Sequence, residues 1–97
     1  MELGLRGRRA VVTGGSKGIG RAVVAELLAE GAAVAFCARN GDEVKAAEHE
    51  LAQANPEAPV SGWVTDVTDP DAVQRFVDGA AEGLGGIDIL VNNAGAA

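Results

Sequence analysis

The chain has 97 residues, which is enough for one small domain. Hydrophobic residues make up 47% and charged residues 23%, so the chain can bury a core and does not have the composition of a disordered protein. The formal net charge of −6 argues against nucleic-acid binding, because phosphates are bound by basic surfaces. The one basic cluster is Arg6, Arg8 and Arg9, which we interpret as a solvated flank of the first strand.

Cysteine usage and hydropathy favour a cytoplasmic protein. Cys37 is the only cysteine, which excludes an internal disulfide and a cysteine-based metal cluster. The N-terminal stretch MELGLRGRR is too polar for a signal peptide. No apolar run approaches the about 20 residues that a membrane span needs. We therefore expect a cytoplasmic location and no membrane partner.

Four short apolar segments, each typical of a strand buried on both faces, alternate with three helical patterns. The strands are predicted over residues 10–13, 32–38, 60–65 and 87–91. The first helix is predicted from the stripe Ile19, Val23 and Leu27, and Gly31 ends it.

The other two helices carry clear start and stop signals. In the second, Asn40 is the predicted cap, Asn55-Pro56 is the stop, and the buried stripe is Val44, Ala47, Leu51 and Ala54. The third opens with a cap and a first-turn proline at 68–71 and closes at Gly85-Gly86. Its predicted stripe is Val73, Phe76, Val77, Ala80 and Leu84.

The strongest chemical signal is a glycine-rich turn between the first strand and the first helix, with the sequence Thr13-Gly14-Gly15-Ser16-Lys17-Gly18-Ile19-Gly20. A diphosphate needs backbone N–H groups at a helix N-terminus and backbone without side chains in the way. We expect Gly14 to allow the sharp turn, Gly18 to let phosphates approach, and Gly20 to let the helix pack closely on the sheet. The spacing G-x-x-x-G-x-G differs from that of a P-loop, since no G-K-[ST] follows.

Strands separated by helices predict a parallel sheet with right-handed crossovers. Together with the glycine turn, they indicate an α/β protein with a partial, doubly wound Rossmann fold. We expect the order β-α-β-α-β-α-β, strand order 3-2-1-4 and truncation after the fourth strand. Residues 1–97 are then the N-terminal part of one dinucleotide-binding domain.

Arg39 stands at the end of the second strand, 19 residues after Gly20, where a Rossmann domain meets the adenosine ribose. An acidic residue there selects NAD, whereas an arginine can bind the 2′-phosphate of NADP. Lys17 can add a second positive charge, so the sequence favours NADP over NAD. The alternative is that both are ordinary surface residues.

Four motifs occur in order along the chain: TGGSKGIG at 13–20, Arg39-Asn40, Asp66-Val67 and Asn92-Asn93-Ala94-Gly95. Together they resemble the first half of the short-chain dehydrogenase/reductase family, particularly members such as tropinone reductases and 3-oxoacyl-carrier-protein reductases. The resemblance implies that Asp66 and Val67 hold the adenine edge and that Asn93, Ala94 and Gly95 line the cofactor near its ribose. It also implies that Asn92 steadies the sheet. The alternatives are turn-capping roles for Asp66 and for the two asparagines.

The resemblance further implies catalysis by a serine, a tyrosine and a lysine, with the tyrosine as the acid whose pKa the lysine lowers. The sequence contains no tyrosine, so we expect no catalytic residue in this chain and no activity of the chain alone. Three hypotheses remain: the cofactor-binding half of an NADP-dependent oxidoreductase, a non-catalytic dinucleotide-binding or sheet-completing module, and an inactive remnant.

The predicted topology leaves the last strand at an edge of the sheet and leaves one sheet face covered by a single helix. An apolar edge of this kind invites pairing with another chain, so we expect self-association or pairing there. Three further residues are interpreted as structural: His49 as solvated, Trp63 as core, and Cys37 as a small buried hydrophobe.

Overall fold

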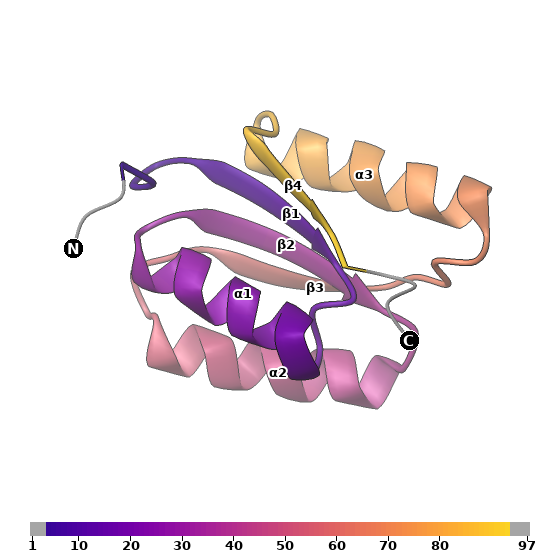
Figure 1. The fold of residues 1–97 in the computed structure, drawn as a ribbon, viewed down its shortest axis with the longest axis horizontal. Helices are drawn as coiled ribbons and strands as arrows, with labels where there is room; N and C mark the ends of the chain where they lie inside the picture. The colour runs from indigo at the N-terminus through magenta and orange to yellow at the C-terminus, as the bar shows by residue number, and fades with distance from the viewer. Residues whose placement is uncertain (1–3, 94–97) are drawn as a thin grey trace.

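A computed structural model, which describes residues 4–93, has three helices alternating with four strands in the predicted order (Figure 1). The elements are β1 (Arg9–Thr13), α1 (Gly18–Ala29), β2 (Ala33–Ala38), α2 (Gly41–Ala54), β3 (Val60–Val64), α3 (Pro70–Leu84) and β4 (Ile89–Asn92). All strand pairs are parallel and the sheet order is β3-β2-β1-β4. The predicted fold class and topology are confirmed.

The sheet separates two apolar clusters. Helices α1 and α2 lie together on one face and α3 lies on the other, as Figure 1 shows. Alternate residues of β1 supply both clusters: Val12 packs toward α1 and α2, and Val11 packs toward α3. This arrangement explains why the central strands read as continuous apolar runs, because a parallel strand covered on both faces has no polar side.

The predicted helix caps are confirmed. The Asn40 side chain accepts hydrogen bonds from the amides of Asp42 and Glu43, at 2.9 and 3.1 Å. Asp69 caps α3, and Pro70 follows it at the first helical position. Gly85 ends α3 in the left-handed conformation, with φ of 82°.

The predicted stripe of α1 was wrong by one residue. The structure buries Gly20, Val24 and Leu28, whereas Ile19 is 77% exposed. Val23 and Leu27 only flank the core. In α2 the predicted stripe holds for its first three members, but Ala54, at the last helical position, is exposed.

Arg9 was wrongly interpreted as a solvated flank. It lies in β1, and its guanidinium donates to both carboxylate oxygens of Asp88, at 3.0 and 3.3 Å, and to the Gly85 carbonyl at 2.6 Å. The amide of Arg9 donates to the same carboxylate at 2.9 Å. These bonds tie the start of β1 to the loop between α3 and β4 and help to fix the position of β4 beside β1.

The two ends of the sheet are protected unequally. On β3, the carboxylate of Glu48 accepts a hydrogen bond from the Gly62 amide at 2.5 Å, which occupies a backbone donor of this edge strand. On β4, the Leu90 side chain is 61% exposed on the face of the sheet that α3 covers. Within residues 4–93, no helix has the length and apolarity to cross a bilayer.

Candidate functional site

The predicted site residues converge at one edge of the sheet. Gly14, Arg39, Asp66 and Asn93 each come within two residues of a strand's carboxyl end. Because the strands are parallel, these ends lie side by side, and Figure 1 shows α1 beginning at the same edge. Ligands of open α/β sheets bind in this position. Ala94 and Gly95 lie outside the described residues.

The glycine turn has the backbone shape that was expected of it. Gly14 and Gly18 have φ of +73° and +61°, a region that favours glycine. The amides of Gly14 and Gly15 both donate to the carbonyl of Cys37, at 2.8 and 3.0 Å. The first half of the turn is therefore fastened to the end of β2, and these two amides are already occupied.

The second half of the turn presents the start of α1. Lys17 is the N-cap residue, and its side chain makes no capping hydrogen bond. The first amides of a helix have no partner within the helix, and the helix dipole makes this end positive. A β-carbon at Gly18 would meet nothing within 4 Å, so the space beside this backbone is open. The start of α1 can thus receive an anion such as a diphosphate.

Gly20 lets the start of α1 approach the glycine turn closely, whereas we expected it to let α1 pack closely on the sheet. A β-carbon on Gly20 would lie 1.9 Å from the Gly14 carbonyl oxygen and 2.6 Å from Nδ2 of Asn93. The atoms that Gly20 approaches therefore belong to the glycine turn and to the residue after β4. The Asn93 Nδ2 donates to the same Gly14 oxygen at 3.2 Å.

Thr13 joins the glycine turn to β4. Its hydroxyl donates to Oδ1 of Asn92 at 3.1 Å and accepts from the amide of Asn93 at 3.0 Å. Asn92 thus makes the sheet-steadying contact that the resemblance implied. Asn93 also has a structural contact, to Gly14, and its expected place beside a cofactor ribose remains a prediction.

Arg39 and Asp66 form an ion pair across the ends of β2 and β3, with 3.2 Å between Nη2 and Oδ1. The same Oδ1 accepts from the Thr68 hydroxyl at 2.7 Å and the Thr68 amide at 2.9 Å. These Thr68 bonds, and then Arg39, hold the pKa of the Asp66 carboxyl below its usual range. Asp66 therefore makes the turn-capping contacts of the alternative interpretation, and its contact with adenine remains a prediction.

Lys17 is the second predicted phosphate-binding cation. Its Nζ lies 3.7 Å from Oε1 of Glu43, with the lysine side chain 80% exposed. Arg39 is 73% exposed. Both cations can therefore be reached from solvent, and each faces one carboxylate.

Val67 packs against the apolar cluster under α3, and its contact with adenine remains a prediction. Trp63 packs against the same cluster, and its ring meets Phe76 edge to face at 5.8 Å. His49 is exposed on α2. Cys37 is fully buried, and burial raises the pKa of its thiol, which makes it a poor nucleophile.

Sequence reasoning missed two contributors to the site. A β-carbon on Gly15 would lie 2.6 Å from Cβ of the buried Phe36, so Gly15 lets the turn pack on β2. Two adjacent glycines at 14 and 15 were the available signal. Glu43 was not among the residues predicted for the site, and no sequence signal paired it with Lys17.

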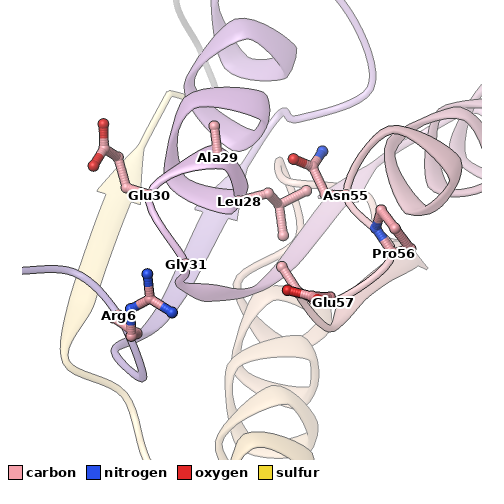
Figure 2. A pocket seen from close by; sticks show the side chains of 9 residues that line it. Arg6, Leu28, Ala29, Glu30, Gly31, Asn55, Pro56 and Glu57 are labelled. Carbon is pink, nitrogen blue, oxygen red and sulfur yellow. The ribbon is translucent and has the colours of Figure 1, made fainter. Parts of the chain in front are cut away.

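A separate pocket lies away from this edge of the sheet. A cleft of about 610 Å³ opens between the end of α1, the loop 55–58 and Arg6 (Figure 2). Gly31 and Ala58 precede β2 and β3, so this cleft is at the amino ends of the strands, opposite the glycine turn. Its wall mixes Arg6 with two acidic residues, Glu30 and Glu57, and gives no convergent chemistry. Within the described part of the chain, no cluster of three metal-binding side chains is present.

Comparison with known proteins agrees with this geometry. The family model for short chain dehydrogenases matches residues 8–97. A tropinone reductase homologue of Arabidopsis thaliana is 42% identical over 92 residues, which cover 94% of this chain and 34% of that protein.

Two solved structures are similar in fold. L-sorbose reductase of Gluconobacter frateurii, complexed with NADPH and L-sorbose, superposes with a TM-score of 0.92 at 38% identity, covering 99% of this chain and 36% of that one. An NADPH-bound short chain oxidoreductase of Pseudomonas aeruginosa PAO1, containing an atypical catalytic center, gives a TM-score of 0.88 at 52% identity, covering 91% and 34%. The chain spans about a third of the length of these relatives. With a family match over nearly its whole length, the chain belongs to the short-chain dehydrogenase family.

Proposed function

We propose that this chain binds NADP(H) and is the cofactor-binding half of an NADP-dependent oxidoreductase that transfers hydride between a carbonyl and an alcohol. The observation that carries the proposal is the position of Arg39. A solvent-accessible guanidinium at the end of β2 lies at the sheet edge where the uncapped start of α1 faces outward. A Rossmann site with arginine at this position suits a ribose 2′-phosphate.

Different residues of the chain bind different parts of the dinucleotide. The turn 13–20 receives the diphosphate, with amides from the start of α1 and open backbone at Gly18. Arg39 and Lys17 hold the 2′-phosphate, a role suited to charge-assisted hydrogen bonds. Asp66 and Val67 contact the adenine, and Asn93 with Ala94 and Gly95 lines the ribose side. The NADPH bound in two similar solved structures supports NADP(H) as the dinucleotide.

Catalytic turnover is assigned to residues outside this chain. The bound nicotinamide would supply or accept the hydride, and a proton donor must act on the carbonyl oxygen. The sequence contains no tyrosine to serve as that donor in the way the family resemblance implies. We therefore expect the 97-residue chain alone to bind cofactor without turnover.

Calorimetric titration of the purified chain with NADPH and NADH tests the proposal. Wild-type protein should prefer NADPH, and Arg39→Asp should weaken NADPH binding by about 2 kcal/mol, which is roughly 30-fold, by removing a phosphate contact and adding repulsion. Arg75→Asp is the control, since Arg75 is exposed on α3, which covers the other face of the sheet. An unchanged preference in Arg39→Asp would remove Arg39 from the site.

A second role is proposed for β4. Leu90 is exposed on an edge strand that pairs only with β1 among the described residues, so this edge can pair with another polypeptide or another copy of the chain. We also propose a cytoplasmic location, which the single free thiol at Cys37 supports.

A further inference from the structure

Glu43 connects the two segments that carry the proposed phosphate-binding cations. Its amide donates to Oδ1 of Asn40, the residue after Arg39, at 3.1 Å. Its carboxylate lies 3.7 Å from Nζ of Lys17 in the glycine turn. Glu43 is thus fixed by its backbone beside one cation-bearing segment and reaches the other with its side chain.

The two ion pairs at this edge differ in how firmly they are held. Asp66 is fixed by two hydrogen bonds from Thr68, so its contact with Arg39 is anchored at one end. The Glu43 side chain is 43% exposed, and within residues 4–93 its carboxylate forms one ion pair, the 3.7 Å contact with Lys17, and no hydrogen bond. Exposed pairs of this kind are weak and are screened by salt. Of the two cations, Lys17 is therefore the one that is held more weakly by its carboxylate partner.

We propose that Glu43 tunes the discrimination between NADPH and NADH by competing with the ligand's 2′-phosphate for the Lys17 ammonium. This inference rests on the NADP-binding function proposed above. The 2′-phosphate of NADPH can bind the Lys17 ammonium only after the ion pair between Lys17 and Glu43 is broken. NADH lacks this phosphate, so its binding does not require that ion pair to break. Glu43 is a positioning residue, because it acts through Lys17.

The test is the Glu43→Gln variant, titrated with NADPH and with NADH. The substitution keeps the size of the side chain and removes its charge, so NADPH affinity should rise about two- to five-fold at low salt while NADH affinity stays constant. The gain should shrink as ionic strength rises. Asp42→Asn is the matched control, with the same charge change in the same helical turn at a residue that forms no ion pair within residues 4–93.

A double-mutant cycle with Lys17→Gln separates competition for lysine from general repulsion of the phosphate. In the Lys17→Gln background, Glu43→Gln should no longer raise NADPH affinity. A gain of the same size with and without Lys17, or an equal gain in Asp42→Asn, would overturn the inference while leaving NADP binding intact. If the wild-type chain bound neither nucleotide, the proposed function itself would be wrong.

Discussion

The contact at Gly20 gives the sharpest test of how the glycine turn is built. In Gly20→Ala, the new β-carbon would lie 1.9 Å from the Gly14 carbonyl oxygen, about 1.5 Å short of an ordinary van der Waals distance of 3.4 Å. This oxygen belongs to the backbone, so no rotamer change can relieve the contact. Either α1 or the turn must move, and the Asn93 bond to Gly14 moves with it.

Two opposing terms set the size of the effect. Alanine is favoured over glycine in a helix by about 1 kcal/mol. Overpacking against rigid surroundings costs about 3 kcal/mol at the upper end of its usual range. The net loss of unfolding free energy should be about 2 kcal/mol, which corresponds to a Tm decrease of roughly 8–16 °C for a chain of this size.

The assay is thermal and urea unfolding of Gly20→Ala beside Gly83→Ala. Gly83 is an exposed residue in the last turn of α3, where a β-carbon would meet nothing within 4 Å. The control should therefore stabilise the protein by about 0.5 kcal/mol, opposite in sign to Gly20→Ala. If both variants shifted Tm in the same direction, the close approach at Gly20 would not be a real constraint.

Two further outcomes are expected. The hydrogen bonds from the Arg9 side chain and backbone hold the pKa of Asp88 below its usual range. The stabilisation that they give is therefore fully present above the unfolded-state pKa of about 3.9. It is lost as the pH falls through the lower pKa of the folded state. Urea midpoints measured from pH 6 to 2 should fall more steeply for wild type than for Asp88→Asn, and parallel curves would contradict the assignment. Leu90→Lys should reduce self-association of the chain in sedimentation velocity without lowering Tm, because Leu90 is exposed. A wild-type chain that is monomeric at high concentration would refute the pairing of two copies through β4.

The fold could be predicted because each local signal agreed with the others. The caps at Asn40 and Asp69 and the stop at Gly85 act through contacts with adjacent residues, so the sequence pattern contains them. The buried face of α1 could not be predicted from such local signals. A stripe of large apolar residues began at Ile19, but the helix is oriented by the close approach at Gly20, which places Val24 and Leu28 inward. A glycine counted as a core position would have given the correct face.

The candidate site was predictable in its positions and less so in its contacts. Strand ends identify which residues meet at the sheet edge, and the topology follows from alternating elements. The ion pairs of Arg39 with Asp66 and of Lys17 with Glu43 depend on side chains far apart in sequence. The Arg9–Asp88 contact joins residues 79 positions apart, so the local composition around Arg9 contained no sign of it.

The hydrogen bonds to the Cys37 carbonyl affect which length of ligand the site can accept. By accepting the amides of both Gly14 and Gly15, this oxygen fastens the turn to β2 only two residues before Arg39. The distance from the glycine turn to the Arg39 backbone is therefore fixed, because both are attached to the end of β2. A molecule occupying both places must match that span, since the turn cannot slide to meet a shorter or longer one.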